Sequence, residues 1–167
     1  MLIRVRPALE QDAAALSRIH FEAVHRTAAP FYPPDVIDTW SIAPNETRVG
    51  QFRQAIAGND ELFLVAERNG VVVGFGSIVP SAAELRSVYV HPDLGRSGVG
   101  AAILQRLERW AIEKGVSELH MDASLNAEAF YSRHGYEIVE RSSHQLGRGP
   151  RMACVRMRKS LQEGREP

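Results

Sequence analysis

Two apolar runs joined by a tight turn constrain the fold of this chain more than any other stretch. The runs cover residues 62–67 and 71–79, and Asn69 and Gly70 lie between them. Asn-Gly favours the two-residue turn whose twist matches that of two paired strands, so this stretch predicts an antiparallel hairpin. A third apolar run over residues 84–90 follows closely. We therefore expect an antiparallel sheet at the centre of the chain.

Helical patterns lie on both sides of this β-rich stretch. A short strand over residues 2–9 precedes helical patterns that begin at residue 10 and at residue 46. Downstream, an amphipathic helix is expected over residues 99–114, and a shorter one over residues 127–134. Further strands are expected over residues 119–123, 136–140 and 152–157. Because hairpins occur beside strand–helix–strand units, we predict an α/β domain with a mixed sheet.

Composition limits what the chain can do. Its 20 basic and 20 acidic side chains cancel, so no overall field attracts nucleic acid or an anionic membrane. One cysteine, Cys154, excludes an internal disulfide framework, and the spacings typical of zinc sites do not occur, so we expect no metal. Without a signal peptide or a membrane span, we expect a cytoplasmic protein. The length fits one domain over residues 1–167, with a frayed tail from about residue 161 to 167.

The stretch from Val88 to Gly100 has the strongest chemical signal. It runs from a strand through a turn into a helix, with glycines at positions 95, 98 and 100. The first turn of a helix leaves backbone N–H groups unpaired, and glycine allows a phosphate to approach them closely. The stretch lacks the Gly-Lys-Ser/Thr ending of a P-loop and fits the dinucleotide-binding fingerprint poorly. By itself, it predicts either an ordinary packed turn or another kind of phosphate site.

This strand–turn–helix unit resembles the acyl-coenzyme A site of the GNAT superfamily of N-acetyltransferases. The matching residues are Tyr89, Val90, His91, Pro92, Arg96, Gly98 and Gly100. The chain departs from the family signature at Gly95, where Arg or Gln is usual. A second motif that begins at Ser124 resembles the family's Asn-x-x-Ala-x-x-Phe-Tyr-x-x-x-Gly-Phe/Tyr. It matches at Phe130, Tyr131, Gly135 and Tyr136.

The resemblance implies a fold and a reaction. The fold is the GNAT fold, a mixed and largely antiparallel sheet of about seven strands with a bulge or splay in the fourth strand and flanking helices. The reaction is direct transfer of an acetyl group from acetyl-CoA to a primary amine of a small molecule or peptide, without a metal. A non-catalytic module that binds acyl-CoA as a sensor or interaction domain is the alternative. The acceptor and the oligomeric state, a homodimer among the options, are left open.

The resemblance also assigns residues to the parts of the cofactor. Backbone N–H groups of Val88, Tyr89 and Val90 are expected at the thioester carbonyl, where negative charge develops. The phosphate contacts are expected from Gly95, Arg96, Ser97, Gly98, Val99, Gly100 and Ala101. Ser124 and Asn126 are interpreted either as further cofactor contacts or as helix caps.

Two residues are candidates for acid–base catalysis. Tyr131 matches the family's general-acid tyrosine; a phenol with a pKa of about 10 is protonated at neutral pH and can donate to a leaving thiolate. The alternative for Tyr131 is packing under the sheet. Glu84 has the spacing of the glutamate base in the histone-acetylating branch, and its alternative is a solvated charge at a strand start, with proton removal through water. The aromatic segment from Phe31 to Trp40 lies where the family's acceptor wall usually falls.

Overall fold

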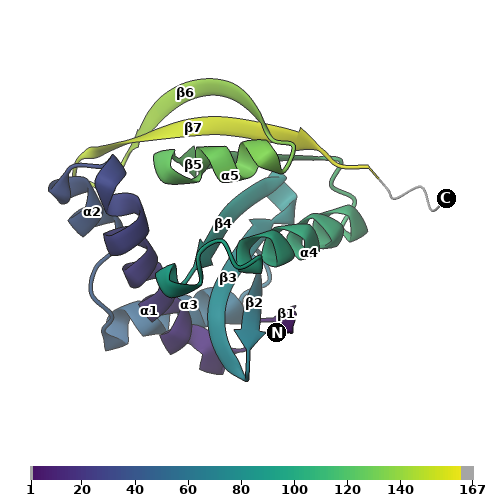
Figure 1. The fold of residues 1–167 in the computed structure, drawn as a ribbon, viewed down its shortest axis with the longest axis horizontal. Helices are drawn as coiled ribbons and strands as arrows, with labels where there is room; N and C mark the ends of the chain where they lie inside the picture. The colour runs from purple at the N-terminus through teal and green to yellow at the C-terminus, as the bar shows by residue number, and fades with distance from the viewer. Residues whose placement is uncertain (1, 163–167) are drawn as a thin grey trace.

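The computed structural model describes residues 2–162 and contains one seven-stranded sheet with the strand order β1-β2-β3-β4-β5-β7-β6. The strands are β1 (Ile3–Pro7), β2 (Leu62–Arg68), β3 (Val71–Val79), β4 (Glu84–Val90), β5 (Glu118–Ser124), β6 (Glu137–Gln145) and β7 (Arg151–Ser160). All neighbours pair antiparallel except β4 and β5, which are parallel. Figure 1 shows β6 and β7 at one end of the molecule and β1 at the other. The predicted mixed, largely antiparallel sheet is confirmed.

Helices cover both faces of this sheet. They are α1 (Ala13–Glu22), α2 (Pro34–Trp40), α3 (Glu46–Ala57), α4 (Val99–Glu113) and α5 (Glu128–Arg133). Alternation along β2 explains the two layers, because successive side chains of a strand point to opposite faces. Leu64 and Ala66 pack in the core cluster of α4, whereas Phe63 and Val65 pack with α1 and α3. No helix within residues 2–162 is both long and apolar enough to cross a bilayer.

The helix α4 lies unusually close to the sheet. A Cβ added at Gly76 of β3 would lie 2.8 Å from Ile103 Cγ2 and 2.8 Å from Leu107 Cδ1. Since such distances are shorter than real Cβ contacts, only glycine fits beneath the helix at this position. The apolar side of α4 is buried here, and its N-terminus is thereby fixed against β4.

The hairpin and most element bounds follow the sequence prediction, but the start of α2 and the lengths of β6 and β7 differ from it. Asn69 and Gly70 have φ values of 55° and 76°, as the predicted turn requires. The prolines before residue 35 indicate a break, yet Pro34 begins α2, because the first helical position needs no N–H group. β6 and β7 extend beyond their predicted bounds.

Of the tail predicted to fray from about residue 161, Leu161 is held in the fold. The backbone N–H of Leu161 donates to Ser117 O at 2.8 Å, and its side chain packs against the core. The rest of that prediction, from residue 163 to 167, lies outside the described residues.

The sheet divides between β4 and β5, and we call this divergence the fork. The two strands share one registered pair, Glu84 with His120. Within β4, the register against β3 shifts so that Arg86 is an extra residue, which is a β-bulge. The bulge and the splay expected for the fourth strand are both present, and they bring side chains of β4 and β5 to a common cavity.

Candidate active site

The fork contains a cavity of about 170 Å³, which we call the fork cavity. β4 contributes Ser87, Val88 and Tyr89 to its walls, and Tyr131 contributes from α5. Trp40 of α2 also lines it, so part of the predicted aromatic acceptor wall lies at this cavity. The fork therefore joins strand backbone, a buried phenol and the N-terminal helices in one place.

Tyr131 contributes a buried phenol ring to the fork cavity. Its side chain is 3% exposed, and its hydroxyl makes no hydrogen bond to any residue between 2 and 162. Burial, followed by the neighbouring Tyr89, raises the pKa of the Tyr131 phenol above its ordinary value. The phenol is therefore protonated at neutral pH, and its O–H group is available to donate to a bound ligand.

The backbone of β4 presents N–H groups to the fork at two of the three predicted positions. His91 N–H donates to Val73 O of β3 at 2.9 Å. Because N–H groups alternate between the two edges of a strand, Tyr89 N–H also faces β3, whereas Val88 and Val90 N–H groups face the fork. Tyr89 instead lines the fork cavity with its partly buried side chain, and desolvation of the phenol raises its pKa to about 12.

The glycine loop forms a second cavity of about 290 Å³, which we call the loop cavity. Gly98 is the N-cap of α4 with φ 85°, and no side chain caps this helix end. At Gly100, an added Cβ would lie 3.3 Å from the Phe130 ring. The loop cavity is lined by Val88, Val90, Leu94, Gly95, Arg96, Gly98, Gly100, Ala101, Phe130 and Arg133. Uncapped N–H groups at the start of a long helix favour an anion such as a pyrophosphate.

Two predicted loop residues contribute less than the sequence indicates. The hydroxyl of Ser97 donates to Leu94 O and does not line the loop cavity. The side chain of Val99 is 1% exposed and packs in the core, which leaves its backbone N–H as its contribution.

The second motif contains an unsatisfied polar atom. Asn126 Oδ1 is buried and lacks a hydrogen-bond partner within residues 2–162. Asn126 lines a further cavity of about 140 Å³ together with Gly95 and Tyr89. Ser124 precedes the short helical turn at Leu125–Ala127, but its side chain makes no capping hydrogen bond and lines the fork cavity. The capping interpretation fails for Ser124. For Asn126, a buried acceptor that awaits a donor fits an amide group of a bound cofactor.

The position of Glu84 differs from that of the other predicted site residues. Glu84 lies at the closed end of the fork, where it pairs with Arg86 at 3.4 Å, and it lines none of the cavities described here. The bulge at Arg86 interrupts the alternation that would place Glu84 and Val88 on one face. The general-base role of Glu84 stays a prediction, and its position does not support it.

Sequence reasoning missed a second carboxylate. Glu61 accepts a hydrogen bond from Ser77 Oγ at 2.6 Å and lies 3.7 Å from Arg86. It lines a cavity of about 280 Å³, the Glu61 cavity, which shares Arg86, Ser87 and Tyr89 with the fork cavity. No local motif surrounds Glu61, so only the pairing of β2 with β3 and β3 with β4 reveals this position.

The same cavity has a buried histidine in its wall. His20 of α1 is 7% exposed, and its Nδ1 lies 2.7 Å from Ser41 Oγ. Burial lowers the pKa of His20 to about 3, with smaller contributions from Arg48 and His25. The imidazole is therefore neutral at physiological pH and forms an aromatic wall with Tyr89, 4.7 Å away between ring centroids.

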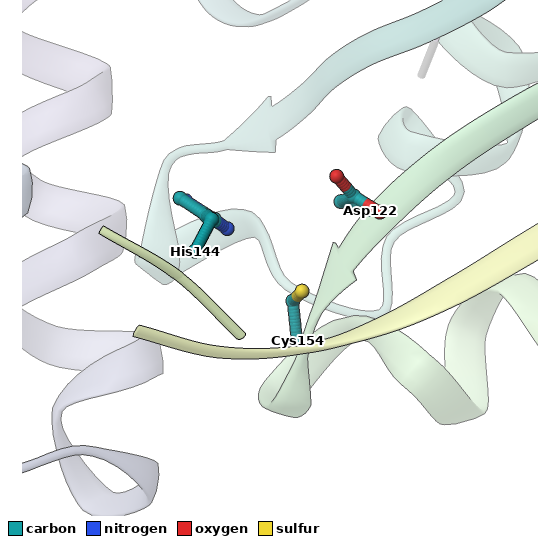
Figure 2. Close-up of side chains that lie close together, drawn as sticks. All are labelled: Asp122, His144 and Cys154. Carbon is teal, nitrogen blue, oxygen red and sulfur yellow. The ribbon is translucent and has the colours of Figure 1, made fainter. Parts of the chain in front are cut away.

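Three side chains from separate strands also meet at the fork cavity: Asp122, His144 and Cys154 (Figure 2). Cys154 is buried, as the sequence indicates. Burial, with a further contribution from Asp122, raises the pKa of the Cys154 thiol. The side chain is thus a neutral thiol at physiological pH and not an activated nucleophile.

Comparisons with known proteins agree with this arrangement. Residues 21–136 match the model of the acetyltransferase (GNAT) family. YafP, an uncharacterized N-acetyltransferase of Escherichia coli (strain K12), is 30% identical over 138 residues, which cover 83% of this chain and 83% of that protein. A GCN5-related N-acetyltransferase from Rhodopseudomonas palustris has a TM-score of 0.86 at 31% identity, covering 96% of this chain and 99% of that one.

A more distant structure shares the fold. The PaiA N-acetyltransferase of Thermoplasma acidophilum, solved in complex with coenzyme A, has a TM-score of 0.75 at 22% identity, covering 96% of this chain and 99% of that one. The fold, the glycine loop, the fork and the similar proteins all point to the same family. The chain belongs to the GNAT family of acetyltransferases, and it is an acetyl-CoA-dependent acyltransferase.

Proposed function

We propose that this enzyme transfers an acetyl group from acetyl-CoA directly to a primary amine of a small molecule or peptide, with Tyr131 as the general acid. The observation that carries the proposal is the side chain of Tyr131, which lines the fork cavity and whose hydroxyl makes no hydrogen bond to the described part of the chain. A phenol whose proton has no acceptor in the protein can donate it to a ligand in the cavity. The sulfur of a leaving thiolate is such an acceptor.

The chain's own residues fit acetyl-CoA along the fork. The N-terminus of α4 and the glycines at 95, 98 and 100 would hold the pyrophosphate. Asn126 Oδ1 would accept from an amide of the pantetheine arm, since it lacks a donor in the described chain. Acetyl-CoA supplies the activated acyl group, and the protein supplies position and charge stabilisation.

Two groups of the fork act on the reacting atoms. The N–H groups of Val88 and Val90 donate to the thioester oxygen as the amine nitrogen attacks and negative charge develops there. As the C–S bond breaks, Tyr131 gives its proton to the sulfur, and free coenzyme A leaves as the thiol. The amide bond forms in the same sequence, so no acyl-enzyme is required.

The acceptor must also lose a proton, because alkyl amines are mostly protonated at neutral pH. Of the two carboxylates near β4, Glu61 has the better position for this role. It lines a cavity that shares three residues with the fork cavity, whereas Glu84 lines neither. We therefore assign Glu61 as the general base, which takes the proton of the amine directly or through one water.

A panel of amines tests the proposed reaction. The chain is mixed with acetyl-CoA and amino acids, polyamines, aminoglycosides or peptides with free N-termini, and free thiol is measured with the acetylated product. We expect thiol release that depends on the amine and matches the product one to one. Thiol release without any amine, or binding of acetyl-CoA without turnover on the whole panel, would contradict it; the latter result fits a sensor domain.

Tyr131→Phe tests the general acid. We expect kcat to fall roughly 10² to 10⁴-fold while the Kd of acetyl-CoA changes little, because only a transition-state interaction is lost. Tyr136→Phe is the matched control, since this neighbouring tyrosine instead donates to Glu108 Oε1 at 3.0 Å. An equal kcat in the two variants would return Tyr131 to a packing role. A cytoplasmic location remains a prediction of the sequence, and the oligomeric state stays open.

A further inference from the structure

Three potential metal ligands converge on one side of the fork cavity. Asp122 lies on β5, His144 on β6 and Cys154 on β7, and one ligand atom from each lies within 4.8 Å of the other two. All three line the fork cavity, and Figure 2 shows the sulfur of Cys154 between the other two side chains. They form a group that the acetyl transfer does not use.

Strand register explains why these residues meet. β7 lies between β5 and β6, and Cys154 pairs with Ser124 on one side and with Ser142 on the other. Asp122 and His144 are each two positions from those partners, so they are diagonal neighbours of Cys154 on the same face. The convergence is thus fixed by two antiparallel ladders and does not depend on a loop.

The three groups are free to bind a ligand. Neither His144 nor Cys154 makes a side-chain hydrogen bond within the described chain, and Asp122 has only a long contact, 3.4 Å from Arg156 Nε. Arg156 itself binds Glu140 more closely, at 2.6 Å. The lone pairs of all three candidate ligands therefore remain available.

The donor set selects a class of metal. One sulfur, one imidazole nitrogen and one carboxylate oxygen suit a borderline-soft divalent cation, whereas magnesium and calcium prefer oxygen ligands alone. In a tetrahedral zinc site the bond lengths of about 2.0 to 2.3 Å place ligand atoms about 3.3 to 3.8 Å apart. From separations of at most 4.8 Å, closure takes small side-chain rotations, and two of the side chains are exposed.

We propose that Asp122, His144 and Cys154 form a binding site for a divalent cation of the zinc type, whose fourth ligand position opens to the fork cavity. When the metal–sulfur bond forms, the Cys154 thiol releases its proton to solvent, so a thiolate and a carboxylate face the two positive charges. The open position would take water or a ligand atom of a molecule in the cavity. This inference does not rest on the proposed acetyl transfer, because metal binding is measured without substrates.

Cobalt binding tests the site directly. The full-length chain, purified without an affinity tag, is titrated with Co²⁺ while its absorption spectrum is recorded. We expect one cobalt per chain, a thiolate-to-cobalt charge-transfer band in the near ultraviolet, d–d bands as strong as four-coordination gives, and loss of all bands when Zn²⁺ is added. A wild-type chain without a charge-transfer band would overturn the proposal.

Variants assign the ligands. Cys154→Ser should abolish the charge-transfer band, and His144→Gln and Asp122→Asn should each weaken Co²⁺ binding at least about tenfold. His120→Gln is the matched control, since this exposed histidine of β5 pairs with Glu118 and lies outside the cluster. An unchanged titration in His144→Gln would also overturn the proposal. If the buried Cys154→Ser variant does not fold by circular dichroism, the two exposed variants decide the outcome.

Discussion

The loop cavity and the Glu61 cavity are lined by alternate residues of β4, Val88 and Val90 for the first and Ser87 and Tyr89 for the second, and they are built in different ways. Most of the loop cavity comes from the stretch between Val88 and Ala101, with Phe130 and Arg133 added from α5, and its chemistry lies in backbone N–H groups and glycine conformations. The Glu61 cavity comes from α1, α3 and three strands, and its chemistry lies in side chains such as Glu61, His20 and Arg48. The first kind of site is readable from a motif and tolerates few substitutions. The second kind is assembled by tertiary structure, so no short motif marks it.

Substitution of the carboxylates Glu61 and Glu84 tests the role of the Glu61 cavity and has the largest expected effect. Glu61→Gln should lower kcat/KM about 10²-fold and remove the acidic limb of the pH–rate profile, as loss of a positioned base does. Glu84→Gln should leave the profile nearly unchanged, because Glu84 lines neither cavity. The reverse pattern would make Glu84 the base, and unchanged profiles in both variants would indicate proton removal by water alone.

Substitution of the glycines at the two ends of α4 tests the loop cavity, whose chemistry lies in the backbone. Gly98 has φ 85° and Gly115 has φ 81°, and an added Cβ meets no atom within 4 Å at either position. Gly98→Val and Gly115→Val should therefore lose similar stability, roughly 1 to 2 kcal/mol. Only Gly98→Val should also lose the stabilisation by acetyl-CoA, about 2.7 kcal/mol at one hundred times its Kd. Thermal shifts of both variants check this, and an equal ligand response would remove the loop from the binding site.

Substitution of Asn126 should have opposite effects on acetyl-CoA binding and on the stability of the free protein. Asn126→Leu should weaken acetyl-CoA binding about tenfold, the value of one hydrogen bond, and should raise the Tm of the free protein because a buried oxygen without a donor is removed. Calorimetry gives the Kd and the Tm. A lower Tm with an unchanged Kd would show that Asn126 is structural.

The buried histidine of the Glu61 cavity predicts a smaller, pH-dependent effect. The pKa of His20 is about 3 in the folded protein and 6.5 in its ordinary state, so below pH 6.5 the unfolded chain binds a proton that the native chain does not. The free energy of unfolding should therefore decrease on acidification by about 1.4 kcal/mol per pH unit relative to His20→Asn. Urea midpoints of both proteins at pH 7.5 and at pH 5.5 measure the difference. Parallel losses of stability in the two proteins would contradict the low pKa.

The comparison also explains what the sequence predicts. The hairpin, the helices α3 and α4 and the glycine loop depend on local turn chemistry and periodicity, and the structure has them at the predicted residues. The fork and the bulge of β4 were expected from the family resemblance, because no local pattern marks a strand that loses its partner. The motif residues Tyr131 and Asn126 share this origin.

Residues that act through long-range pairing were not predictable. Glu61 meets β4 through two strand registers, and the Asp122–His144–Cys154 cluster needs three strands in register. The predicted oxyanion role of Tyr89 N–H failed because the sequence does not state which edge of β4 each N–H group faces. Glu84 was placed by spacing alone, and one extra residue at Arg86 changes what that spacing means.

The single registered pair between β4 and β5 has a mechanical consequence. Every other pair of neighbouring strands within residues 2–162 shares at least five registered residues, so the sheet consists of two stiff leaves hinged at Glu84 and His120. The two leaves share one core, in which Leu64 and Leu85 of one leaf pack with Leu119 and Met121 of the other, so side-chain packing and not a ladder resists opening of the fork. Tyr32 of the N-terminal segment adds two hydrogen bonds to one of these leaves. Its hydroxyl donates to Ala153 O of β7 at 2.6 Å and accepts from Leu125 N–H, just after β5, at 2.8 Å. Tyr32 therefore joins the N-terminal segment to the leaf of β5, β7 and β6 beside the fork cavity, so the shape of the fork depends on contacts outside the strand ladders.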